Sequence, residues 1–187
     1  MPEHAGKADP LQSLLDAARR SGDGLPPVEL WEPDYCGEMD MVIRRDGSWW
    51  HEGRRITRDR LTRLFARILR KDDDGVHYLV TPFEKIGITV EIAPFLAIRM
   101  DRIGVGCDQV LVFETNMGDL VELGTDHGFT LFEAEDGQPV PLIHVRGRLQ
   151  ALLSRPVFYE LVDLVSEHQG RDGIWSGGVF FPLEPTT

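Results

Sequence analysis

The sequence predicts an α+β protein of two similar units with mostly antiparallel sheets. Alternating apolar and polar residues over 39–44 predict a strand, Asp46-Gly47 supplies a hairpin turn, and 48–52 predict the returning strand. Apolar residues at helical spacing over 61–69 then predict a helix of about three turns. The order of strand, Asp-Gly turn, strand and helix recurs over 130–164, about 90 residues further along. We therefore interpret the chain as a duplicated strand-turn-strand-helix unit, with a cleft between the two copies.

The other elements follow from local signals along the chain. Asp9 as N-cap and Pro10 as the first helical residue predict a helix that ends at Gly22. A second helical pattern runs over 149–170, and Pro156 either kinks it or begins a new helix. Short apolar runs bounded by turn residues predict strands at 77–81, 86–90, 95–100, 109–115, 119–123, 129–134, 140–145 and 179–181. Strands this short and this regular are typical of a curled antiparallel sheet or partial barrel, which we expect in the C-terminal half together with a helix.

This order divides the chain into three segments. Residues 1–27 are expected to form an N-terminal helix and a linker rich in Gly and Pro, 28–82 the first α+β unit and 83–187 the second. A chain of 187 residues, of which 42% are hydrophobic and 27% charged, has the composition of a globular protein with a sizeable core.

Two further features of the composition bear on the compartment. The longest apolar runs, such as 93–98, are far shorter than the roughly 20 residues that a membrane helix needs. Cys36 and Cys107 are too few and too far apart for a disulfide framework or a thiolate zinc site. We expect a cytoplasmic, bacterial protein.

The formal net charge of -11 is unevenly distributed. Residues 44–71 hold nine Arg and one Lys against three acids, whereas 108–137 hold eight acids and neither Lys nor Arg. The basic and the acidic stretch either attract each other or form two separate hydrated faces of the protein. Alternatively, the arginines bind an anionic ligand, because planar guanidinium groups match the oxygens of a phosphate or carboxylate. Nucleic acid is disfavoured as a partner, because a protein with a pI near 4.9 repels a polyanion over most of its surface.

No catalytic or cofactor motif accompanies these elements. Gly104-Val105-Gly106 lacks the third glycine and the following helix of a dinucleotide fingerprint, and the histidines are never spaced i, i+4. We predict no catalytic residue, metal or cofactor, and leave open an enzyme whose site is assembled from scattered Asp, Glu and His residues.

Seven residues are candidate contacts for a ligand in the cleft, the cations for charge and an indole for stacking. They are Arg44, Trp50, Arg55, Arg58, Glu84, Lys85 and Arg146. If Trp49 is buried, Trp50 and Arg44 lie together on the opposite face of the sheet. The Trp50 indole is then either an exposed platform on which an aromatic ligand stacks or a side chain covered by a helix or loop. Glu84 and Lys85 form a surface ion pair or a polar group at the mouth of the cleft.

Several segments of the sequence resemble a known family. They are 36–40, 45–49, Glu52-Gly53, Leu64-Phe65, Ala93-Pro94-Phe95 and, as the most specific, Tyr78-Leu79-Val80-Thr81-Pro82-Phe83-Glu84-Lys85. Over roughly 27–165 the chain resembles the bacterial family called domain of unknown function 1285. The resemblance implies a duplicated α+β fold, a C-terminal half superficially like a pleckstrin-homology barrel, and a ligand site between the halves for a nucleotide-like signal.

The combined interpretation is a binding or signalling module. We expect it to recognise a small anionic, nucleotide-like ligand in the cleft between the two units. The alternative is a protein-interaction adaptor, in which the barrel-like C-terminal half offers a sheet edge or an apolar groove to a partner peptide.

Overall fold

The computed structural model describes residues 10–20 and 24–185, which form two compact units. Within these residues, the first unit comprises the chain up to Val42 together with Trp49–Thr89. The second comprises Ile43–Ser48 and the chain from Val90 onward. The predicted N-cap Asp9 and helix end Gly22 lie outside the described residues.

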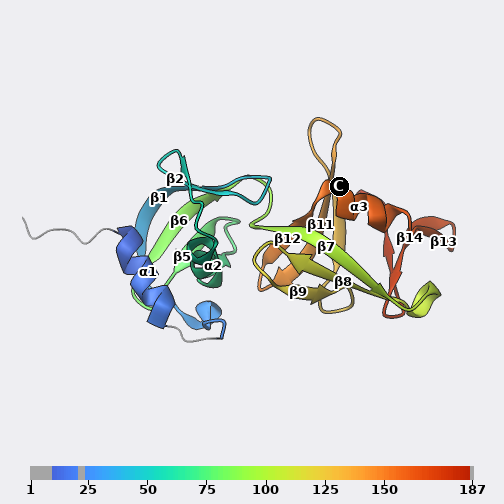
Figure 1. Ribbon diagram of the computed structural model, residues 1–187, viewed down its shortest axis with the longest axis horizontal. Coiled ribbons are helices and arrows are strands. Elements are labelled where there is room, and N and C mark those ends of the chain that lie inside the picture. The colour runs from blue at the N-terminus through green and yellow to red at the C-terminus, as the bar shows by residue number, and fades with distance from the viewer. Residues whose placement is uncertain (1–9, 21–23, 186–187) are drawn as a thin grey trace, which may run out of the picture. The chain divides into compact units, whose positions relative to one another are not determined.

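The first unit contains a six-stranded sheet of strand order β3-β2-β1-β6-β5-β4 (Figure 1). Its strands are β1 (Tyr35–Ile43), β2 (Trp49–His51), β3 (Arg54–Arg55), β4 (Leu69–Lys71), β5 (His77–Val80) and β6 (Lys85–Val90). β1 and β6 run in the same direction, because Lys85 N–H donates to Asp34 O at one end and Glu91 N–H to Ile43 O at the other. The predicted hairpin is confirmed: Met41 and Ile43 are buried, and Gly47 has a φ of 78° in the turn.

Two α-helices and one 3₁₀ turn accompany this sheet. They are α1 (Pro10–Arg20), α2 (Asp59–Arg67) and η1 (Val28–Leu30). α1 buries Leu14, Leu15 and Ala18, as its apolar spacing predicts. α2 buries Phe65, whose ring stacks on Trp49 with centroids 6.1 Å apart.

The predicted helix over 61–69 ends two residues too late. The helix stops at Arg67, and Leu69 and Arg70 instead pair with Leu79 and Tyr78 in β4. Arg70 therefore belongs to the sheet and not to the helix surface: it is 8% exposed and donates hydrogen bonds to Asp72 and to two backbone carbonyls. Sheet pairing and these bonds outweigh helical propensity, which is a weak preference of a few tenths of a kcal/mol per residue, up to about 1 kcal/mol.

The second unit contains a six-stranded sheet of order β10-β11-β12-β7-β8-β9, curled into a half-barrel (Figure 1). Its strands are β7 (Phe95–Ile103), β8 (Val110–Thr115), β9 (Leu120–Glu122), β10 (Phe129–Glu133), β11 (Pro139–Arg146) and β12 (Leu149–Leu153). The neighbouring pairs with known register are antiparallel, except β12 and β7, which are parallel.

The two sheets repeat one topology. If the six strands of each sheet are numbered one to six in chain order, both sheets have the spatial order 3-2-1-6-5-4. In each sheet the first and the sixth strand are therefore neighbours, β1 beside β6 and β7 beside β12. The predicted series of strand, Asp-Gly turn, strand and helix is also present in both units, at β1, β2, β3 and α2 and at β10, β11, β12 and α3 (Arg155–Val162). In the sheets, however, β10 takes the place of β4 and not of β1, so the repeat of the topology is offset from the predicted one. The fold is thus a duplicated, mostly antiparallel α+β fold.

The first part of the predicted second helix is a strand. β12 lies between β11 and β7, and Leu149, Ala151, Leu152 and Leu153 are all buried. A central strand that is covered on both faces is apolar throughout, so its spacing resembles that of a buried helix. Pro156 begins a new helix, the second of the two predicted possibilities, because it falls in the first turn of α3.

A third sheet completes the second unit, with strands β13 (Ser166–His168), β14 (Arg171–Ser176) and β15 (Val179–Pro182), and η2 (Gly106–Asp108) is a 3₁₀ turn. The sequence predicted β15 but assigned 166–170 to a helix and left 171–176 unassigned. The β13–β14 turn is Gln169-Gly170, with φ of 52° and 77°, and Gln is a weak signal for such a turn.

The division between the units falls after Thr89 rather than at the expected 82/83, because β6 completes the first sheet. No helix within residues 10–20 and 24–185 is long and apolar enough to span a membrane.

Candidate functional site

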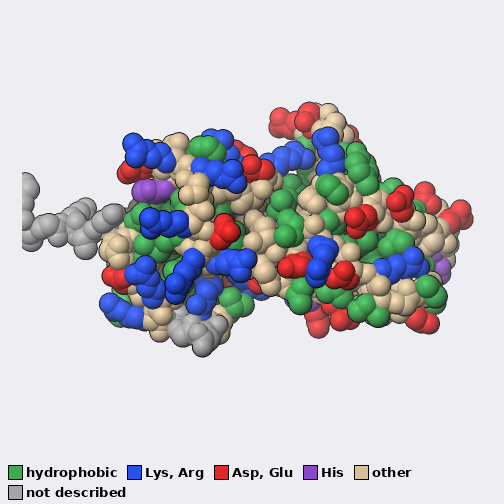
Figure 2. All heavy atoms as spheres, in the orientation of Figure 1, with side chains coloured by type: hydrophobic (Ala, Val, Ile, Leu, Met, Phe, Trp, Pro, Cys, Tyr) green, Lys and Arg blue, Asp and Glu red, His purple; other side chains and the backbone are tan. Residues whose placement is uncertain are grey.

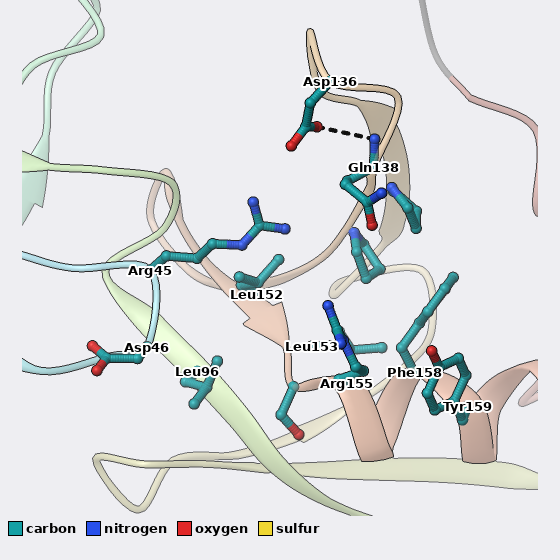
Figure 3. A pocket seen from close by; sticks show the side chains of 13 residues that line it. Arg45, Asp46, Leu96, Asp136, Gln138, Leu152, Leu153, Arg155, Phe158 and Tyr159 are labelled. Carbon is teal, nitrogen blue, oxygen red and sulfur yellow. Dashed lines mark hydrogen bonds between the residues drawn. The ribbon is translucent and has the colours of Figure 1, made fainter.

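A pocket of about 760 Å³ opens on the second unit (Figure 3). Its polar lining residues are Arg45, Asp46, Asp136, Gln138, Ser154 and Arg155, and its apolar ones are Leu96, Pro139, Pro141, Leu152, Leu153, Phe158 and Tyr159. This volume lies in the range of pockets that hold small molecules.

Three loop or helix ends converge on this pocket. Arg45 and Asp46 come from the first Asp-Gly turn, Asp136 and Gln138 from the second, and Arg155 from the start of α3. Strands β7 and β12 supply the apolar floor. Because turns and helix ends leave backbone groups and side chains directed away from the sheet, a site at this position is built of polar groups above an apolar base.

The two carboxylates of the pocket are already engaged within their own turns. Asp46 Oδ1 accepts hydrogen bonds from Ser48 N–H at 2.9 Å and from Ser48 Oγ at 2.5 Å. Asp136 Oδ1 accepts one from Gln138 N–H at 3.0 Å, the dashed line in Figure 3. Each carboxylate closes an Asx turn, which is a structural role.

The two guanidinium groups of the pocket differ from the carboxylates in this respect within the described residues. Among residues 10–20 and 24–185, no carboxylate forms an ion pair with the side chain of Arg45 or of Arg155. Both residues are exposed, and in Figure 3 the Arg45 side chain reaches across the pocket above Leu152. Ser154, the N-cap of α3, makes no capping hydrogen bond with its side chain. The partial positive charge at the N-terminus of α3 therefore adds to the positive electrostatic potential of the two guanidiniums in the pocket.

The turn that carries Arg45 is held in place from two sides. Asn116 Nδ2 donates to Gly47 O at 3.3 Å, while Asn116 Oδ1 accepts from Leu96 N–H at 3.0 Å. On the other side, Arg45 N–H donates to Glu91 Oε2 at 2.7 Å. The backbone of Arg45 is therefore held from both sides, and its exposed side chain extends from a fixed turn.

Five of the seven predicted contacts lie in the first unit, in different environments. Trp50 is half-buried and pairs across the β2–β3 hairpin with Arg55, which is exposed like Arg58 at the start of α2. Glu84 accepts a hydrogen bond from Ser13 Oγ at 2.9 Å.

Lys85 pairs with Asp72 at 3.0 Å and lies 4.5 Å from the Tyr78 ring centroid. Partial burial raises the pKa of Asp72, but hydrogen bonds and charge from Arg70 and Lys85 outweigh it, so the pKa of this carboxyl is lowered. Lys85 thus belongs to a structural ion-pair network.

The other two predicted contacts lie in the second unit, outside the pocket. Arg44 is exposed and follows β1. Arg146 donates to Asp119 Oδ1 at 2.6 Å and lies over the Phe95 ring at 4.8 Å. Burial lowers the pKa of Arg146, and Asp119 offsets part of that effect.

None of the seven predicted residues lines the pocket. The sequence nevertheless held a signal for it, because the two Asp-Gly turns that indicate the duplication supply two of its walls. Within the described residues, no group of three or more His, Cys, Asp and Glu side chains is arranged to hold a metal ion. Cys36 and Cys107 are both exposed free thiols.

Comparison with known families covers both halves of the chain. Residues 26–93 match "Domain of unknown function (DUF1285), N-terminal domain", and residues 94–183 match "Protein of unknown function (DUF1285), C-terminal domain". The chain belongs to the DUF1285 family.

Two solved structures of DUF1285 proteins are similar to the chain. A crystal structure from Silicibacter pomeroyi DSS-3 is 42% identical, with a TM-score of 0.86, over 92% of this chain and 94% of the other. One from Shewanella baltica OS155 is 26% identical, with a TM-score of 0.52, over 67% and 91%. No curated protein matches the chain. The border between the two DUF1285 domains, after residue 93, lies close to the division after Thr89.

Proposed function

We propose that this protein is a binding or signalling module for a small anionic ligand, and that the ligand occupies the pocket of the second unit. One observation carries the proposal: the Arg45 and Arg155 guanidiniums face the same pocket, and no carboxylate among residues 10–20 and 24–185 pairs with either. Guanidinium forks match phosphate and carboxylate oxygens, and each charge-assisted hydrogen bond contributes about 1.5–3 kcal/mol.

The rest of the pocket restricts the ligand further. Leu96, Leu152 and Leu153 form an apolar floor, and Phe158 and Tyr159 extend along α3 beside it. A ligand that joins an anionic group to a flat or apolar body therefore uses both parts of the pocket. A nucleoside monophosphate has this chemistry, with its phosphate at the guanidiniums and its base against the aromatic rings.

The proposal is tested by calorimetry and thermal shift with nucleoside monophosphates and with aryl phosphates and carboxylates as probes. The Arg45→Ala and Arg155→Ala substitutions each remove one fork and are expected to weaken binding at least about ten-fold, since 1.4 kcal/mol is a factor of ten. Arg102→Ala removes an equally exposed guanidinium outside the pocket and serves as the matched control. Absence of stabilisation by every probe at millimolar concentration, or equal losses in all three variants, would refute the proposal.

The cleft between the units and its seven contacts stay a sequence prediction, which the same titrations test through Trp50→Ala and Arg58→Ala. The adaptor function of the barrel-like half likewise stays a prediction.

A further inference from the structure

The exposed face of α2 carries a stripe of guanidinium groups that the proposed ligand pocket does not use. Arg60, Arg63 and Arg67 follow each other at intervals of three and four residues, so they fall within about 60° of the helix circumference. Together with Asp59 and Leu64 they line a hollow of about 380 Å³ on the first unit. We name Arg60, Arg63 and Arg67 the α2 stripe.

Internal partners account for only part of this charge. Arg67 donates to Gly24 O, which anchors it against the segment before η1. Arg60 and Arg63 are exposed, and no acidic side chain of the described ranges, 10–20 and 24–185, forms an ion pair with them. Asp59 is the one acid in the lining, and its place in the first turn of α2 favours its charge through the helix dipole.

Apolar side chains lie beside the stripe. Leu64 forms part of the hollow and is half-buried, and Leu25, next to the carbonyl that holds Arg67, is 57% exposed. Figure 2 shows Lys and Arg side chains gathered over the first unit around α1 and α2. The surface therefore combines a line of positive charge with exposed apolar contacts.

We propose that the α2 stripe docks a short acidic segment of a protein partner that carries an apolar anchor residue. The stripe is about 10 Å long, which matches three residues of an extended peptide at about 3.3 Å each. Carboxylates in such a segment pair with the guanidiniums, and its anchor lies against Leu64 and Leu25. A long polyanion or an anionic membrane is disfavoured, because a chain of net charge -11 repels any anionic surface that extends beyond the stripe.

The test uses synthetic twelve-residue peptides rich in Asp and Glu around one leucine, titrated into the full chain at 150 mM salt and followed by fluorescence anisotropy. Matched peptides carry Ser in place of the leucine, or Gln and Asn in place of the acids. Sodium tripolyphosphate and vesicles with phosphatidylserine form the phosphate and membrane arms.

The acidic leucine peptide is expected to bind with a dissociation constant below about 100 μM and to weaken at least ten-fold in Arg63→Glu and in Arg60→Glu/Arg63→Glu. Arg102→Glu, which makes the same charge change on the second unit, is expected to leave binding within two-fold. Amide chemical shifts are expected to move on α2 and not around Arg155, which separates this surface from the ligand pocket.

Three results would overturn the proposal. They are no peptide binding at millimolar concentration, peptide binding that is insensitive to Arg63→Glu, and binding of tripolyphosphate or vesicles at α2 without binding of the peptides.

Discussion

Replacing Gly47 by Ala tests how tightly the turn that carries Arg45 is held. Gly47 has a φ of 78°, and a methyl group there would lie 2.7 Å from Asn116 Nδ2 and 3.2 Å from Leu96 Cβ. The positive φ costs a non-glycine residue about 1–2 kcal/mol. The short contact displaces the Asn116 amide and weakens its two hydrogen bonds, each contributing about 0.5–1.5 kcal/mol. Together these terms predict a loss of about 2–5 kcal/mol in the free energy of unfolding.

Gly75 supplies a matched control in another turn. Its φ is 81°, and an added methyl group there meets nothing within 4 Å. Gly75→Ala therefore carries the backbone cost alone, about 1–2 kcal/mol. The difference between the two variants measures the contacts of the methyl group with Asn116 and Leu96, which we expect at about 1–3 kcal/mol.

Urea denaturation followed by circular dichroism and tryptophan fluorescence measures both losses. The double variant Gly47→Ala/Asn116→Ala closes a thermodynamic cycle, because the methyl group then has no amide to displace. In the Asn116→Ala background, the cost of Gly47→Ala is expected to fall toward that of Gly75→Ala in the wild type, with only the 3.2 Å contact to Leu96 Cβ remaining. Equal losses for Gly47→Ala and Gly75→Ala in the wild-type background would refute the reasoning.

Three further predictions concern buried or coupled polar groups. Burial, with a smaller contribution from the positive charge of Lys71, lowers the pKa of His77 from 6.5 to about 4. The unfolded chain therefore binds a proton at this residue more readily than the folded one. The contribution of neutral His77 to stability is complete above pH 6.5 and is lost as the pH falls toward 4. Between pH 7 and pH 5 the loss in unfolding free energy is expected to be about 2 kcal/mol, and His77→Gln is expected to remove most of it in urea titrations at the two pH values. Arg70→Ala leaves Val28 O and Trp31 O without their guanidinium donor and leaves the partly buried Asp72 with Lys85 as its charged partner. It is expected to cost about 2–4 kcal/mol in the same assay, against less than about 0.5 kcal/mol for the exposed Arg63→Ala; similar losses would contradict the assigned network. The hydrogen bond to Asp74 raises the pKa of Tyr78 to about 12. Ultraviolet titration of the tyrosines is therefore expected to show one late transition, which Asp74→Asn moves to lower pH. An unchanged transition in that variant would contradict this coupling.

Local sequence patterns predicted most of the strands and turns of this protein. The hairpin at Asp46-Gly47 and most strands of both sheets were predictable, because backbone angles and side-chain alternation depend on a few neighbouring residues. Pro156 left two possibilities, a kink or a new helix, and the structure has the second. That the chain is duplicated was also predictable, since similar local signals recur in the same order, although the sheets match β1 with β7 and not with β10. The strand β12 was not, because an apolar central strand and a buried helix have similar composition over five residues.

Local sequence patterns did not predict which arginines of the chain are paired and which line the pocket. Sequence patterns predicted a functional role for arginines near the first hairpin, yet Arg70 is buried in a structural network. Arg45 and Arg155, which face the pocket, have no ion-pair partner in the part of the chain that the structure describes. The partners of these charges lie far away in the chain: Arg70 donates to Val28 O, 42 residues away, and the turn of Arg45 is held by Asn116, 69 residues from Gly47.

The sequence by itself therefore determined the family, the duplicated order of elements and the excess of arginine between residues 44 and 71. Only the tertiary structure decided which guanidiniums are neutralised and which face an open pocket. Conformation is set by neighbours along the chain, whereas the state of a charge depends on the groups within a few ångströms of it in space. In this fold, strand pairing brings those groups together from segments far apart in the sequence.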